Sequence, residues 1–122
     1  MDPYESTGTL TLREARVAFT TALADLIHEI ALRGYEAALA EGMDRKTTKD
    51  PTTDHMLNSL HEIGLAQDID LYLDGTYLSD TVDHTQFGLF WEELGVTRQL
   101  PLTWGGRWGD GNHYSLRWQG RR

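Results

Sequence analysis

The chain has 122 residues, 39% of them hydrophobic and 25% charged, which is ordinary for one globular domain with one core. It contains no cysteine, which excludes disulfides, thiolate nucleophiles and cysteine-based zinc sites, so that any metal would be held by His, Asp or Glu. With a formal net charge of −8, the chain lacks the positive electrostatic field that binding to nucleic acid or to an anionic membrane requires.

The first third of the chain predicts a tail and one long helix. Residues 1–9 are polar and have no basic region followed by an apolar run, so we expect a flexible tail and no signal peptide. Thr11 and Glu14 match a capping box at a helix start, and Gly34 is a typical stop. Apolar residues recur between them at helical spacing: Leu12, Ala15, Phe19, Ala22, Leu23, Leu26 and Ile30. This pattern predicts a helix over about 12–33 that packs on a sheet.

The middle of the chain predicts strands and a long loop. Residues 35–41 fit a short strand, and residues 44–58 are polar, which is typical of a functional loop. Residues 65–73 alternate between apolar and polar, as a half-buried strand does. The dipeptide at 74–75, Asp-Gly, predicts a hairpin turn, and residues 76–78 return as a strand.

The last third predicts a second helix over 83–94, stopped by Gly95. The glycine-rich, aromatic stretch 104–112 predicts an irregular loop, and residues 113–118 alternate as a last strand. No apolar run is long enough to span a bilayer. We therefore expect a single domain over 1–122 of the α+β class, with a small, mainly antiparallel sheet and helices packed on one face.

Two short blocks carry the residues with chemical potential. The first is Ser59-Leu-His61-Glu-Ile-Gly64-Leu-Ala66-Gln-Asp68. On one strand His61 and Asp68 would lie roughly 23 Å apart, and on one helix roughly 10 Å apart. The chain must therefore turn between them if both are to bind one ion, and Gly64 permits such a turn.

The second block, Asp110-Gly-Asn-His113, supplies a third ligand and a further carboxylate. Two imidazoles and a carboxylate are the set that a catalytic Zn²⁺ uses when it keeps a fourth position open for water. His61, Asp68 and His113 are therefore the predicted ligands, and Asp110 is the predicted general base.

Several other residues allow more than one interpretation. Glu92 and Glu93 are rival bases, although a solvated helix face is the simpler reading. Trp104 and Trp108 either line a substrate groove or cover the core. His55 lies in the long loop, and Asp83-His84 is expected to open the second helix.

The two blocks, in this order and separation, resemble the signature of the M15 (VanY/VanX-like) zinc peptidases. Within that family the chain looks most like the phage L-alanyl-D-glutamate peptidases, from about Tyr35 to Trp118. The resemblance implies a hedgehog/DD-peptidase-like fold, with Zn²⁺ held by the three ligands named above. It also implies that Asp110 is the catalytic carboxylate, which many members supply as Glu. Arg45 matches an arginine that contacts the substrate or its oxyanion. Ser59 matches a serine near the substrate, with a local cap as the other interpretation.

The function that the resemblance implies is hydrolysis of a peptide bond in the peptidoglycan stem peptide, with L-alanyl-D-glutamate as the expected bond. A monomeric phage or prophage endolysin is expected, made in the cytoplasm and acting at the cell wall or carried in the virion. Two alternatives remain open: a D-alanyl-D-alanine carboxypeptidase or dipeptidase, and a non-catalytic virion or wall-binding protein stabilised by its metal. No nucleic-acid partner and no membrane insertion are expected.

Overall fold

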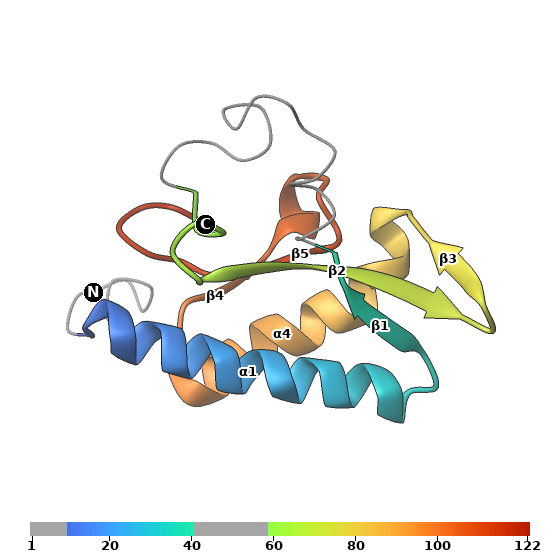
Figure 1. Cartoon of the computed structure of the whole chain (residues 1–122), viewed down its shortest axis with the longest axis horizontal. Coiled ribbons are helices and arrows are strands. Elements are labelled where there is room, and N and C mark those ends of the chain that lie inside the picture. Colours follow the sequence, from blue (N-terminus) through green and yellow to red (C-terminus); the bar gives the residue numbers. More distant parts are fainter. Residues whose placement is uncertain (1–9, 41–58) are drawn as a thin grey trace.

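A computed structural model describes residues 10–40 and 59–122 of the chain. In order these residues form α1 (Leu12–Leu32), β1 (Glu36–Leu39), β2 (Ala66–Leu73), β3 (Thr76–Leu78), the 3-10 helix η2 (Thr81–His84), α4 (Thr85–Arg98), β4 (Leu102–Trp104), the 3-10 helix η3 (Gly105–Trp108) and β5 (His113–Leu116) (Figure 1). The α+β class is confirmed. The expected tail over 1–9 and loop over 44–58, with Arg45 and His55, lie outside the described residues.

The described strands form one antiparallel sheet in the order β1-β2-β5-β4. β5 pairs with the first residues of β2, and β3 pairs with its last residues. Asp74 and Gly75 both have positive φ, at 51° and 79°, as a two-residue hairpin turn of this kind requires. The predicted hairpin is therefore confirmed.

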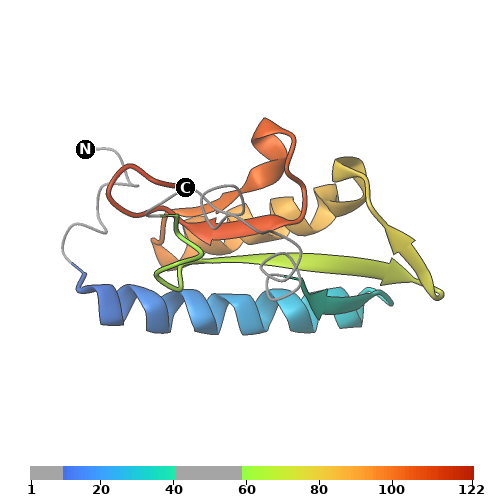
Figure 2. The same ribbon diagram turned by 45° about the horizontal axis from the view of Figure 1, so that its top comes forward.

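The register of the sheet decides which side chains face the helices. Asp68 lies opposite His113, so their side chains share one face, whereas Tyr114 points to the other face. Tyr114 packs edge-on against Trp91 of α4, with ring centroids 5.9 Å apart, and Trp91 packs in turn against Phe19 of α1. Figure 2 shows α1 running beneath β2. Both helices thus cover one face, and Asp68 and His113 lie on the opposite face.

The start and end of α1 are confirmed. Thr11 Oγ1 accepts a hydrogen bond from Glu14 N (3.1 Å), and Glu14 Oε1 accepts one from Thr11 N (2.8 Å), which completes the capping box. Gly34 follows the helix with φ 88°. Most of the predicted stripe is buried, but Leu12 is 38% exposed because it lies in the first turn, before the helix reaches the sheet. The fully buried positions are Ala15, Phe19, Ala22, Leu26 and Ile30.

The prediction that Gly95 ends the second helix is wrong. α4 begins at Thr85, after η2, and continues to Arg98. A Cβ at Gly95 would lie 2.7 Å from the carbonyl oxygen of Leu100 and 3.0 Å from Leu102 Cβ. The glycine therefore permits close packing of the helix on β4, and Gln99, with φ 56°, ends the helix instead.

The glycine-rich stretch is more regular than predicted, because residues 105–108 form η3. Gly106 accommodates the indole of Trp104, which would collide with a Cβ there or at Gly88 of α4, and Gly105 lies against the backbone of Asp110. The last strand is shorter than predicted and ends at Leu116, since Trp118 turns back to bridge with Arg121. None of the helices described for residues 10–40 and 59–122 is long and apolar enough to cross a membrane.

Candidate metal centre

His61 is placed by a tight turn before β2. Ser59 Oγ accepts a hydrogen bond from His61 N (3.2 Å), and Leu65 N donates to Leu60 O (2.9 Å). Gly64 has φ 78°, a conformation that residues with a Cβ rarely adopt. The predicted turn between His61 and Asp68 is therefore present.

The turn brings His61 next to the Asp68–His113 pair of the sheet. His61 Nε2 lies 3.3 Å from His113 Nδ1, and Asp68 Oδ1 lies 3.5 Å from the first nitrogen and 3.4 Å from the second. Three ligands bound tetrahedrally to one Zn²⁺ at about 2.0–2.1 Å would be separated by roughly 3.3–3.4 Å. The three atoms thus form a nearly equilateral triangle of the size that one small metal ion requires. This His/Asp/His group could hold a metal ion.

The triad is largely withdrawn from water. His61 and Asp68 each expose 9% of their surface and His113 exposes 6%. Within the described residues, His113 Nε2 is buried without a hydrogen-bond partner. A buried carboxylate beside two imidazoles is costly unless positive charge compensates it. A divalent cation supplies that charge, so the donor set and its burial both fit a metal.

Asp110 is in the turn between η3 and β5, three residues before His113. Its backbone is held by hydrogen bonds from Asp110 N to Gly105 O (2.9 Å) and from His113 N to Asp110 O (3.2 Å). Partial burial raises the pKa of the Asp110 carboxyl above its usual value and the Asp68 carboxylate raises it further, whereas His113 and His61 lower it. The pKa of the Asp110 carboxyl is therefore influenced by all three members of the triad. The residue as a whole is still exposed to solvent.

The other predicted residues separate into those near the triad and those away from it. Ser59 caps the His61 turn, as one of its two interpretations predicts. Glu92 forms an ion pair with Arg107 of η3, with oxygen–nitrogen distances of 2.6 and 2.9 Å, and Glu93 is exposed. Arg45 lies outside the described residues.

The two tryptophans have different environments. Trp104 is 4% exposed, belongs to the core, and donates its Nε1–H to Gly111 O (2.7 Å). Trp108 is 37% exposed and packs beside His113, with ring centroids 5.7 Å apart. The guanidinium of Arg122 lies over the Trp108 ring at 4.1 Å from its centroid. Only Trp108 of the two therefore borders the triad in the described part of the chain.

His84 and Thr81 are the site-related residues whose roles the sequence did not reveal. His84, predicted with Asp83 to open the second helix, instead ends η2 and is the residue before α4. Its ring is buried and lies 2.9 Å from the hydroxyl of Tyr114, the neighbour of His113. Thr81 contacts the Asp110 turn from η2. Neither contact could be predicted from the neighbouring sequence, because each partner lies about thirty residues away along the chain.

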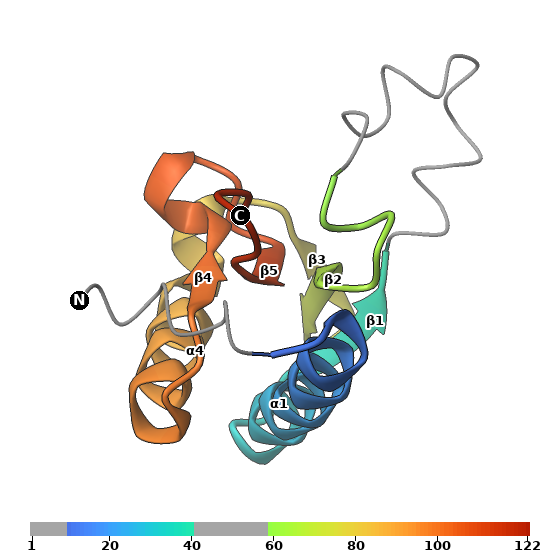
Figure 3. The same cartoon turned by 90° about the vertical axis from the view of Figure 1, so that its left-hand side faces the viewer.

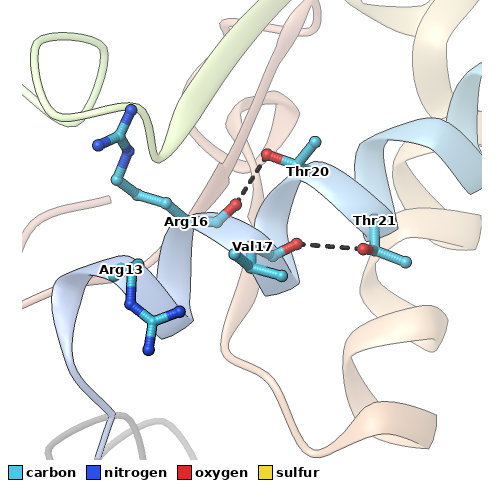
Figure 4. Close-up of a pocket in the computed structure, with 5 residues that line it drawn as sticks. All are labelled: Arg13, Arg16, Val17, Thr20 and Thr21. Atoms are coloured by element: carbon cyan, nitrogen blue, oxygen red, sulfur yellow. Dashed lines mark hydrogen bonds between the residues drawn. The ribbon is translucent and has the colours of Figure 1, made fainter.

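A shallow hollow of about 320 Å³ lies on α1, on the side of the helix where Arg16 extends toward the His61 turn (Figure 4). Its lining consists of Arg13, Arg16, Val17, Thr20 and Thr21. The two threonine hydroxyls donate to carbonyl oxygens of the same helix, those of Arg16 and Val17. This lining includes no member of the triad and no carboxylate, so the hollow is separate from the candidate metal centre.

Figure 3 shows η3, the C-terminal segment and the His61 turn together on the side of the sheet away from α1 and α4. The predicted ligands therefore lie at the face that the helices leave free. Comparison of the chain with protein-family models, with curated proteins and with solved structures found no match.

Proposed function

We propose that the protein is a zinc peptidase that hydrolyses a peptide bond of the peptidoglycan stem peptide. The observation that carries this proposal is the triangle of His61 Nε2, Asp68 Oδ1 and His113 Nδ1, whose sides of 3.3–3.5 Å match one tetrahedral ion. The triangle contributes three protein ligands, as catalytic zinc sites do, and leaves one position for solvent. The resemblance to the M15 peptidases supports the choice of zinc and of peptidoglycan.

The residues around the triangle have complementary roles in this reaction. Zn²⁺, when bound, supplies Lewis acidity that acidifies water and polarises a carbonyl group. Asp110 accepts the proton of the attacking water and returns it to the leaving amine, a role supported by the electrostatic influence of the triad on its carboxyl. Trp108 gives the substrate an apolar surface beside His113. Arg45 and Ser59 are proposed to contact the substrate, as in the family.

The bond that we propose is the one between L-alanine and D-glutamate, and the biological role is that of a phage or prophage endolysin. Cleavage of this bond leaves a free amino group on D-glutamate. Cleavage by a D-alanyl-D-alanine carboxypeptidase would instead remove terminal D-alanine. Mass spectrometry of digested muropeptides therefore distinguishes the two activities.

The proposal is tested with purified peptidoglycan and the zinc-loaded full chain. We expect release of peptides with a new D-glutamate amine, loss of this activity with a chelator, and its return with Zn²⁺. Asp110→Asn should lower the rate by roughly 10²–10⁴-fold, the usual contribution of a general base, while zinc stays bound. Asp70→Asn is the matched control, because Asp70 lies one pleat further along the same face of β2 and contacts Tyr77.

Two results would contradict the proposal. If zinc binds but no muropeptide bond is cut, the metal is a structural clamp and the protein is not this hydrolase. If Asp110→Asn cuts as fast as the wild type, the proton is transferred by another group.

A further inference from the structure

Thr81 makes two hydrogen bonds to the turn that carries Asp110. Its Oγ1 donates to Gly109 O (3.2 Å) and accepts from Gly111 N (3.1 Å). These two residues flank Asp110 directly. One hydroxyl has a donor and two acceptor positions, so a single threonine can make both bonds at once.

Most of the other described hydrogen bonds of this turn come from the segment around it. Asp110 N donates to Gly105 O, and His113 N donates to Asp110 O. Trp104 Nε1 donates to Gly111 O at 2.7 Å. These donors and acceptors belong to residues 104–113. From β2, Ile69 N donates to Asn112 O (2.9 Å) at the end of the turn. Thr81 is in η2, about thirty residues before the turn, and bonds to the two residues that flank Asp110. Thr81 therefore fixes the turn to a separate part of the fold.

η2 is closed by its own contacts at its start and is anchored to β5 at its end. Asp80 and Asp83 form a reciprocal cap, with Asp83 N donating to Asp80 O (3.0 Å) and Asp80 N donating to Asp83 Oδ2 (3.3 Å). At the other end, the buried ring of His84 bonds to the hydroxyl of Tyr114, which adjoins His113 on β5. Thr81 thus connects the Asp110 turn to an element that is anchored to the strand carrying a predicted ligand.

Contact between η2 and the turn is too close for a larger residue. A Cβ at Gly111 would meet Thr81 Cβ and O at 3.0 Å. The glycine after Asp110 therefore serves this approach, and the backbone of the turn lies directly against Thr81.

From these contacts we propose that Thr81 is a positioning residue, which fixes the turn that carries Asp110 and so holds its carboxyl for the reaction at the metal triad. This inference rests on the proposed function, in which Asp110 moves the proton. A displacement of about 1 Å at a reacting group can lower a rate roughly 100-fold, so a hydroxyl that fixes the turn has a measurable effect on catalysis.

The test compares Thr81→Val, which keeps the shape but loses the hydroxyl, with Thr81→Ser, which keeps the hydroxyl. The first readout needs no substrate: hydrogen exchange of the Gly111 amide, followed by NMR on the full chain. We expect exchange about five- to tenfold faster in Thr81→Val, as the loss of one hydrogen bond implies, and a rate near wild type in Thr81→Ser.

The second readout is peptidoglycan hydrolysis by the zinc-loaded protein. Thr81→Val should lower kcat roughly 10- to 100-fold while KM and zinc affinity stay within about twofold, because the turn moves but the ligands do not. Thr81→Ser should restore kcat. Thr21→Val is the control, since it removes a threonine hydroxyl that bonds within α1.

Three outcomes would overturn the inference. The first is that Thr81→Val has the wild-type exchange rate at Gly111 and the wild-type kcat. The second is that Thr81→Ser loses as much kcat as Thr81→Val. The third is that Thr81→Val loses enough zinc affinity to account for its loss of kcat. If the wild type cuts no stem peptide at all, the proposed function fails and the catalytic role of Thr81 fails with it. The Gly111 exchange rates then still show whether Thr81 holds the turn.

Discussion

At the scale of single residues, the metal triad depends on chemistry that a sequence can display. His61 and Asp68 stand in one ten-residue block, and the need for a turn between them follows from strand and helix dimensions. His113 follows a glycine-rich stretch that ends at a strand. His61 and Asp68 could be paired because ligand type and spacing are local properties, whereas His113, far along the chain, is predicted from its ligand type and from the order of the two blocks. Thr81 could not be predicted, since a threonine hydroxyl is common and its partners lie near residue 110.

His84 gives a residue-scale prediction about pH. Burial lowers the pKa of His84 below its usual value of 6.5, and the charge of Asp83 only partly opposes this shift. Above about pH 6.5 the ring is neutral in both the folded and the unfolded chain. Below that value the unfolded chain binds the proton first, so the free energy of unfolding falls until the pH passes the lower pKa of the folded state.

We therefore expect the free energy of unfolding to lose up to about 1.4 kcal/mol per pH unit from His84 as the pH falls below 6.5. His84→Gln should remove this contribution and flatten the curve between about pH 6.5 and 5. His28→Gln, on the exposed side of α1, is the control and should run parallel to the wild type. Urea unfolding at several pH values measures the curves, and equal slopes for wild type and His84→Gln would contradict the assignment.

At the scale of elements, the sequence patterns predict the helices and strands well, but they predict the ends of these elements less well. α1 agrees with prediction because its cap, stripe and glycine stop all indicate the same helix. α4 continues past Gly95 because that glycine meets β4, a use that looks the same in a sequence as a helix end. η3 is missed for a similar reason, since Gly105 and Gly106 read as loop residues.

The close packing of Gly88 against Trp104 leads to a prediction about the free energy of unfolding. A Cβ at Gly88 would overlap the indole of Trp104, which in turn donates to Gly111 O in the Asp110 turn. Gly88→Ala should therefore lower the free energy of unfolding by about 1–3 kcal/mol despite the better helix propensity of alanine. Leu89→Ala, at the next and 49% exposed position, should change it by less than about 0.5 kcal/mol. Thermal unfolding checks both, and a neutral Gly88→Ala would show that the indole has room to move.

At the scale of the whole molecule, the site exists because antiparallel pairing joins distant parts of the chain. β2 and β5 bring Asp68 opposite His113, and the turn before β2 adds His61. η2, which precedes α4 in the chain, then supports the Asp110 turn through Thr81. The α+β class and the grouping of His61, Asp68 and His113 could be predicted, but the strand order and register that bring them together could not, because these depend on contacts between residues far apart in sequence.

The central claim is that His61, Asp68 and His113 bind one divalent ion with a fourth position left for solvent. The most direct measurement is a zinc-loaded crystal structure with anomalous diffraction at the zinc edge, supported by zinc affinities of the variants. We expect one zinc ion at about 2.0–2.1 Å from His61 Nε2, His113 Nδ1 and an oxygen of Asp68. We also expect His61→Ala to lower zinc affinity more than 100-fold, while Asp70→Asn leaves it unchanged. Zinc bound elsewhere, or equal losses of affinity in the two variants, would contradict the account.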